Sequence, residues 1–150
     1  MKRAIAISLL LLTVIGYGFQ YARTNLANEF LNSLNKEQRQ KAHLSFDDLS
    51  RSSWHYLPGA FWPRKGIWLH ELNANQKELI FRLLENSLSE AGYKKTEKII
   101  DLENVLAEMS GNTTFRDPEK YNVAFYGIPE KDSLWAWSFE GHHLSLTEFK

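Results

Sequence analysis

The sequence predicts an α+β domain in which N-terminal helices and a helical hairpin pack on a small antiparallel sheet that ends in a β-meander. Two patterns predict this class. Over much of residues 24–109, apolar side chains recur at the three- and four-residue spacing of amphipathic helices. After Gly111 the apolar residues alternate with polar ones, which is typical of strands that have one buried face. A short strand pair is expected within the helical part.

Two short helices are expected over residues 24–43. Phe30 and Leu34 stand four residues apart, as on one face of a helix. Asn35 then ends the first helix and caps the second. Gln38 follows Asn35 at the spacing of a capping box, in which each side chain accepts a hydrogen bond from the other residue's backbone.

The strand pair is expected at residues 51–56 and 67–72. In the first segment Trp54 and Tyr56 fall on one face, with polar residues between them. Pro58 ends this segment because proline lacks the backbone N–H that a sheet needs. The two strands are therefore separated by a loop that is rich in proline and glycine.

A helical hairpin follows. Asn73 and Gln76 have the spacing of a second capping box, and Gly92 is the expected point at which the chain turns back. The second helix is expected from Lys94 to Met109. Its periodicity places Ile99, Leu102, Leu106 and Met109 on the buried side, and Glu103 and Glu108 on the exterior.

The meander completes the predicted fold. Trp135, Trp137 and Phe139 share one strand face and are expected to pack on the hairpin, since the hairpin needs a large apolar partner. The alternative is that they form a stacking platform for a sugar ring or another flat ligand. The three strands are expected over residues 121–126, 134–139 and 142–149.

Composition excludes several classes of function. The chain has 150 residues, with 18 Lys and Arg balanced by 18 Asp and Glu, so it lacks the excess positive charge that nucleic-acid binding needs. No nucleic-acid partner is expected. The sequence contains no cysteine, which excludes disulfides, thiolate nucleophiles and iron–sulfur clusters. Any site must be built from histidine, carboxylate, hydroxyl and aromatic side chains.

Residues 1–22 are expected to be a signal peptide or an N-terminal membrane anchor. Lys2 and Arg3 precede an uncharged run from Ala4 to Ala22, which is long enough for either role. The positive-inside rule keeps the basic end in the cytoplasm. Residues 23–150 are therefore expected to form a single α+β domain outside the cytoplasm, either periplasmic, secreted or membrane-anchored, that meets the membrane through the N-terminal segment alone.

The strongest candidate for chemistry is the run Glu140, Gly141, His142 and His143. Imidazole and carboxylate groups bind zinc, copper or iron, and a chain without cysteine must build a metal site from them. Adjacent strand residues point to opposite faces, so a bulge at Gly141 is needed to bring both rings together. His55 is the best-placed further ligand. Hydrolysis and oxidation both remain open as reactions, and the alternative is that the imidazoles are structural and hydrogen-bonded.

The aromatic residues give a second candidate function. Trp54 and Trp62 flank the loop that Pro58 interrupts, where aromatic side chains are available to a ligand. This pattern predicts a non-catalytic module that binds a small molecule or a sugar. The sequence alone does not decide between the metal site and the binding module.

Several stretches of the chain match one family in the same order: Phe30–Leu34 with Glu37–Arg39, Trp54–Pro58, Arg64–Gly66, Leu88–Tyr93, Arg116–Pro118 with Tyr121, and Trp135–Leu146. Together they resemble the bacterial family catalogued as domain of unknown function 3500, over most of Leu26–Leu146. The resemblance implies an exported bacterial protein with no established activity. Family members continue with a further half of similar size, whereas this chain departs at Thr147–Lys150. The resemblance therefore implies an N-terminal half that is truncated at its C-terminus.

Overall fold

The structure is a computed structural model that describes residues 18, 21–59, 61–130 and 133–150. It has the predicted α+β class. The first described helix covers residues 21–33. The other helices are α2 (Lys36–Ala42), α3 (Ala74–Ser87) and α4 (Glu90–Ser110), the short 3-10 turns are η1 (Leu49–Ser52) and η2 (Leu69–Glu71), and the strands are β1 (His43–Leu44), β2 (Ile67–Trp68), β3 (Asn122–Tyr126), β4 (Ala136–Gly141) and β5 (Leu144–Phe149).

The predicted signal peptide or anchor falls almost wholly outside the described residues. None of the helices in the described part of the chain combines the length and the apolar character that a membrane crossing requires.

The sheet is mixed rather than purely antiparallel. β3, β4 and β5 form the predicted meander, with Phe125 opposite Trp137 and Phe139 opposite Leu146. The free edge of β3 is shared by two short strands. β2 pairs with it in antiparallel fashion, and β1 pairs with it in parallel, which the sequence analysis did not predict.

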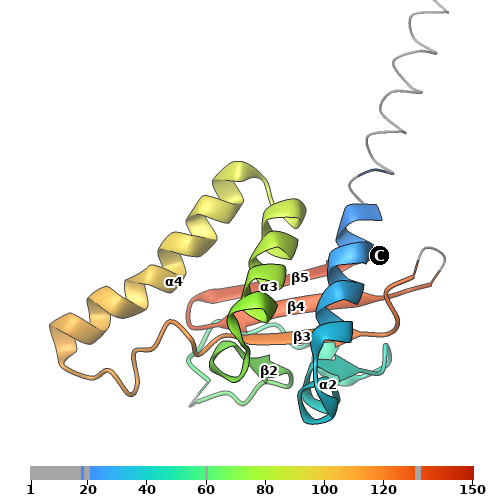
Figure 1. Cartoon of the computed structure of the whole chain (residues 1–150). Coiled ribbons are helices and arrows are strands. Elements are labelled where there is room, and N and C mark those ends of the chain that lie inside the picture. The colour runs from blue at the N-terminus through green and yellow to red at the C-terminus, as the bar shows by residue number, and fades with distance from the viewer. Residues whose placement is uncertain (1–17, 19–20, 60, 131–132) are drawn as a thin grey trace, which may run out of the picture.

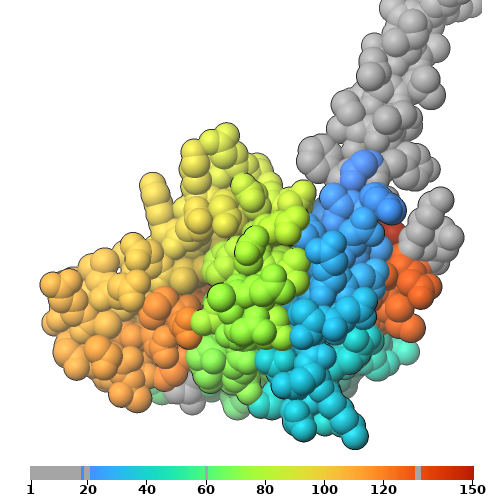
Figure 2. All heavy atoms as spheres, viewed as in Figure 1, coloured from blue at the N-terminus to red at the C-terminus, as the bar shows by residue number. Residues whose placement is uncertain are grey.

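Two apolar clusters lie on the two faces of the sheet. The helix over residues 21–33 and α3 lie side by side on one face (Figure 1), and they close over most of the sheet in the space-filling view (Figure 2). Trp135, Trp137 and Phe139 are buried beneath these helices, so the prediction that they belong to the core is confirmed. On the opposite face a smaller cluster of Ala124, Tyr126 and Ala136 packs against Leu44 and Phe46.

Both predicted capping boxes are present. Asn35 accepts a hydrogen bond from the Gln38 backbone, and the Gln38 side chain accepts one from the Asn35 backbone. Asn73 and Gln76 repeat this arrangement at the start of α3. These local signals are strong because each box satisfies two backbone N–H groups that have no partner within the helix.

The predicted strand pair is wrong in most of its length. Residues 49–52 form η1, because the Asp48 side chain caps a 3-10 turn there, and the following residues pair with no strand. Trp54 and Tyr56 are 64% and 53% exposed. Of the second predicted strand only Ile67 and Trp68 remain, since the chain then turns into η2.

The helical hairpin is present, but its turn and its buried face differ from the prediction. Ser89 caps α4, so the chain turns before Gly92, which lies in the first turn of that helix. The buried face of α4 carries Glu103, whereas the predicted core residues Leu102 and Met109 are 51% and 79% exposed. Figure 1 shows the reason: α4 runs away from α3 at an angle and reaches past the sheet, so it does not offer its apolar stripe to the core.

Gly141 ends β4 directly against the ring of Tyr121. A Cβ atom at this position would lie 2.2 Å from the Tyr121 ring, and Tyr121 is fully buried, so the ring has no free space to enter. We expect Gly141→Ala to lower the free energy of unfolding by about 3 kcal/mol through overpacking. Urea denaturation measures this.

Gly111→Ala is the matched control. Gly111 has φ +67° and no neighbour within 4 Å of an added Cβ, so this change introduces backbone strain without crowding. It should cost only about 1 kcal/mol. Equal losses in the two variants would contradict the close packing of Gly141 on Tyr121.

Candidate functional site

The loop between η1 and β2 contributes residues to two clefts. We call them the arginine cleft, named for Arg64, and the histidine cleft, named for His142. The arginine cleft has a volume of about 380 Å³. Three of the residues singled out by the sequence analysis line it together, namely His55, Trp62 and Glu140.

The floor of the arginine cleft holds a buried guanidinium group. The Arg64 side chain is only 3% exposed. Its Nη2 donates to the backbone carbonyls of His55, Leu57 and Gly141, at 2.9, 2.7 and 3.3 Å. Nε and Nη1 are buried and have no hydrogen-bond partner among the described residues. Burial lowers the pKa of Arg64 from its ordinary value, while the Glu140 carboxylate acts in the opposite direction.

Glu140 supplies an acceptor beside this donor. Its Oε2 lies 3.7 Å from Arg64 Nε, and its Oε1 accepts a hydrogen bond from Ser145 Oγ at 2.8 Å. Burial raises the pKa of Glu140, and the hydrogen bond from Ser145 and the charge of Arg64 oppose this shift. Asn122 stands opposite Glu140 in the sheet, and both polar atoms of its buried amide also lack a partner in the described part of the chain. Unpaired donors and acceptors therefore gather on this face of the sheet.

An aromatic pair forms one side of the arginine cleft. The His55 ring stacks on the Trp62 indole at a centroid distance of 4.4 Å and an interplanar angle of 14°. Trp62 is nevertheless 46% exposed. Trp54 is more exposed, but it lies against Tyr56 and does not line either cleft. Of the two predicted ligand-facing tryptophans, the structure places only Trp62 at a cleft.

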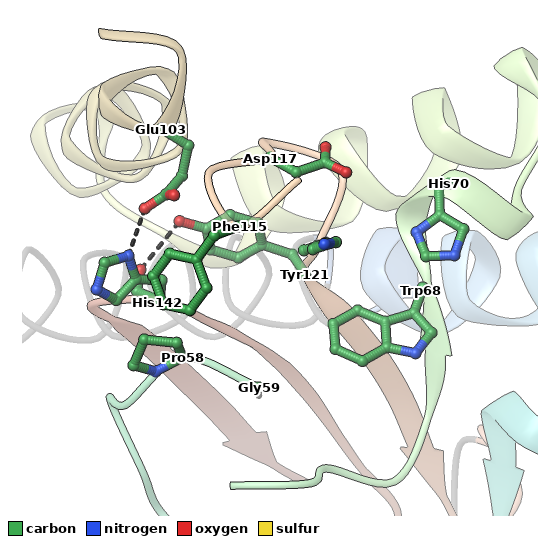
Figure 3. Close-up of a pocket in the computed structure, with 10 residues that line it drawn as sticks. Pro58, Gly59, Trp68, His70, Glu103, Phe115, Asp117, Tyr121 and His142 are labelled. Atoms are coloured by element: carbon green, nitrogen blue, oxygen red, sulfur yellow. Dashed lines mark hydrogen bonds and ion pairs between the residues drawn. The ribbon is translucent and has the colours of Figure 1, made fainter. Parts of the chain in front are cut away.

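The histidine cleft is lined by Pro58 and Gly59 of the same loop and has a volume of about 270 Å³. Figure 3 shows Glu103 and His142 at one end of it, and Trp68 and His70 at the other. The Nδ1 atom of His142 lies 2.5 Å from the Glu103 carboxylate. Glu103 was predicted to be on the exterior of its helix, yet it is only 3% exposed.

The predicted bulge at Gly141 is wrong, because His142 and His143 form the two-residue turn between β4 and β5. His143 adopts a positive φ of 58°, a region that disfavours non-glycine residues. This turn stacks the two imidazole rings at a centroid distance of 3.9 Å. Ligand lone pairs lie in the ring planes, so nearly parallel rings do not point at one ion.

The predicted metal ligands are not gathered at one point. Glu140 and His55 line the arginine cleft, whereas His142 lines the histidine cleft. Over the residues that the structure describes, no group of three or more His, Asp or Glu side chains is arranged to hold a metal ion. Metal binding by this chain therefore stays a prediction.

Sequence reasoning missed two residues that organise the clefts. Arg64 lies in an irregular loop between Pro63 and Gly66, where no periodicity marks a residue as buried. Glu103 lies on a helix whose apolar stripe indicated a different buried face. Neither residue carried a local signal, because both are buried by contacts with segments far away in the sequence.

Asp48 fixes the rim of the arginine cleft. Its carboxylate accepts hydrogen bonds from Lys65 Nζ at 2.8 Å and from the backbone and hydroxyl of Ser50 at 3.0 and 2.7 Å. These bonds, with that from Lys65 the largest contribution, lower the pKa of Asp48 from 3.8 to about 2. Asp48 thus connects η1 to the loop that carries Arg64.

A folded-state pKa below the unfolded value makes the carboxylate stabilising above pH 4, and this contribution is lost as the pH falls toward 2. We therefore expect Asp48→Asn to lower the free energy of unfolding at pH 5, with the difference from the wild type shrinking steadily down to pH 2. Urea unfolding across this range measures it. Asp47→Asn removes an exposed neighbouring charge that makes none of these bonds. A constant wild-type difference for Asp48→Asn, like that expected for the control, would refute the role of Asp48.

Comparison with known proteins places this chain in a family without assigning a reaction. No curated protein and no solved structure matches it. One family, described as a protein of unknown function (DUF3500), matches residues 21–149, which is most of the chain. The resemblance noted in the sequence is therefore confirmed, and the chain belongs to the DUF3500 family.

Proposed function

We propose that this chain is an extracytoplasmic domain that binds a neutral sugar in the arginine cleft. The observation that carries the proposal is Arg64, which lines the cleft and whose buried guanidinium has two nitrogens, Nε and Nη1, without a hydrogen-bond partner among the described residues. An unpaired buried donor costs ~1–3 kcal/mol. A ligand that accepts hydrogen bonds from these groups would remove this cost, which makes the cleft a favourable place for a polar molecule.

The charges around the cleft favour a neutral ligand. Lys65 is paired with Asp48, and Arg64 lies beside Glu140, so the positive and negative groups balance. A sugar hydroxyl both donates and accepts a hydrogen bond. Neighbouring hydroxyls can thus accept from Arg64 and donate to Glu140, and hydrogen bonds to charged groups are stronger than those between neutral ones.

Trp62 supplies the apolar surface that a sugar ring needs. His55 stacks on the indole, which holds Trp62 in place, and nearly half of Trp62 stays exposed at the cleft. Sites for small ligands generally combine apolar and aromatic walls with a few polar groups that set the orientation. The arginine cleft has this composition.

Divalent metal binding through Glu140, His142, His143 and His55 has less support. Glu140 is already bonded to Ser145, and His142 to Glu103, so at least two of the four proposed ligands have other partners.

Sugar binding is tested by titrating the purified protein with glucose, galactose, mannose and N-acetylglucosamine and with their short oligomers. Removing an aromatic stacking surface costs ~1–3 kcal/mol per ring in nucleic-acid complexes. We therefore expect Trp62→Ala to weaken the binding of the recognised sugar by about tenfold or more. Isothermal titration calorimetry gives the dissociation constant.

Trp54→Ala is the matched control, because Trp54 is also exposed on this loop but does not line the cleft. It should leave the affinity unchanged. The proposal fails if the wild type binds none of these sugars, or if the two tryptophan variants weaken binding equally.

The proposed location rests on Lys2, Arg3 and the uncharged run that follows them. We expect the first ~30 residues, which include the whole predicted signal, to export a fused reporter enzyme that is active only outside the cytoplasm. A fusion with Lys2 and Arg3 changed to Glu should be exported poorly. Full-length fusion protein without reporter activity would refute the location, and mass spectrometry of the N-terminus separates a cleaved signal from a retained anchor.

A further inference from the structure

We propose that His142 is a general base in the histidine cleft and that, with Glu103 behind it, it activates water to hydrolyse a small ester. This activity is separate from sugar binding in the arginine cleft. It rests on how the turn between β4 and β5 holds one imidazole against a buried carboxylate at the end of a cleft (Figure 3).

The two nitrogens of His142 have different surroundings. Nδ1 lies 2.5 Å from Glu103 Oε1, so a proton on this nitrogen is donated to the carboxylate. Arg116 Nη1 lies 2.9 Å from the same nitrogen and 3.8 Å from Glu103. Arginine can only donate, so it bonds to Nδ1 only in the tautomer in which Nδ1 has no proton. In the proposed base Nδ1 keeps its proton and donates it to Glu103, and Arg116 is a neighbouring positive charge. Nε2 makes no hydrogen bond with any described residue, and it is therefore the nitrogen that can take a proton from water.

The backbone holds this ring in place. Tyr121 donates a hydrogen bond from its hydroxyl to the His142 carbonyl at 3.0 Å, and the His143 N–H donates to the Tyr56 carbonyl at 2.9 Å. The His143 ring stacks on His142. A carboxylate that orients an imidazole and stabilises its protonated form is the arrangement found behind the base in Ser-His-Asp hydrolases.

Two features of this site are costly for stability alone. Glu103 brings a carboxylate to the buried face of α4, where its partners are His142 and Arg116, and a buried pair of charges is a poor source of stability. His143 occupies a positive φ where glycine would be free of strain. Backbone strain of this kind concentrates at functional sites, where the surrounding structure holds it.

The walls of the cleft suit an ester with an apolar group. Trp68, Phe115 and Pro58 line the cleft, and Lys120 and Asp117 add one charge of each sign. In the proposed reaction, Nε2 takes a proton from water as the water oxygen bonds to the ester carbonyl carbon. The resulting tetrahedral intermediate then breaks its bond to the alcohol oxygen, and His142 returns the proton to the departing alcohol. Ester and water thus give an acid and an alcohol.

The test uses p-nitrophenyl acetate as the probe and the full chain as the enzyme. We expect the wild type to turn over this ester many times per molecule, faster than the same concentration of free imidazole. His142→Gln should lose about 100-fold of this rate, since a positioned general base contributes ~10²–10⁴-fold. Glu103→Gln keeps the size of the side chain but removes the charge, and it should lose about tenfold or more.

Glu108→Gln is the matched control, because it removes an exposed carboxylate from the same helix. It should keep the wild-type rate. The proposal is overturned if the wild type is no faster than imidazole, if His142→Gln keeps the rate, or if EDTA abolishes turnover and zinc restores it.

Thermal unfolding of each variant shows whether it is folded. If both His142→Gln and Glu103→Gln unfold, the role of His142 is tested by treating the wild type with diethyl pyrocarbonate, which modifies accessible neutral imidazoles. Modification mapped to His142 by mass spectrometry, with turnover lost in proportion, supports the base. Modification of other histidines with loss of turnover, while His142 stays unmodified, overturns it.

Discussion

The guanidinium of Arg64 holds together the region in which both clefts form. Through one nitrogen it binds the carbonyls of His55 and Leu57 in the loop and the carbonyl of Gly141 at the end of β4. A planar group with several fixed donors suits this task better than lysine, whose ammonium is a single point of charge. This contact is important for holding the loop on the sheet, because the aromatic residues of the loop are exposed and contribute little buried apolar area.

The same residue leaves part of its bonding capacity unused. Arg64 uses Nη2 to bind the loop and the end of β4, whereas Nε and Nη1 are buried beside the Glu140 carboxylate without a hydrogen-bond partner among the described residues. A buried pair of charges is a poor source of stability because removing both ions from water costs about as much as their attraction returns. The arrangement is easier to understand as a site for ligand polar groups than as a stabilising ion pair.

The end of the β4–β5 hairpin contributes residues to both clefts, with Glu140 in one and His142 in the other. Gly141 allows the strand to lie on the Tyr121 ring, and the turn that follows is bonded to the loop through Tyr56 and to α4 through Glu103. The hairpin thus joins three segments that are far apart in the sequence. Pro58 and Gly59 of the loop line the histidine cleft. Because Gly59 has no side chain, the loop backbone can pass close to the Trp68 ring.

Local signals in the sequence were sufficient for two helix starts and for the C-terminal meander. Asn35 and Asn73 marked helix starts correctly because a capping box involves only residues three apart. The alternation after Gly111 predicted the meander, because a strand with one buried face repeats every two residues. The same alternation correctly assigned Trp135, Trp137 and Phe139 to the core. His55 and Glu140 were singled out as metal ligands and Trp62 as a ligand-facing aromatic, and these roles stay predictions.

Tertiary contacts decided the rest. The alternation at Trp54 and Tyr56 resembled a strand, but no neighbouring strand pairs with it, and a strand needs a partner for its backbone hydrogen bonds. The stripe of Leu102 and Met109 predicted a buried face, but the angle at which α4 leaves α3 buries Glu103 instead. Sequence alone identified His55, Trp62, Glu140 and His142 as candidates, because their side chains are aromatic or carry hydrogen-bonding groups. Only the fold decided that Arg64 and Glu140 meet in one cleft and that His142 meets Glu103 in the other. The residues of each pair are far apart in the sequence, and a local pattern such as periodicity says nothing about the distance between them.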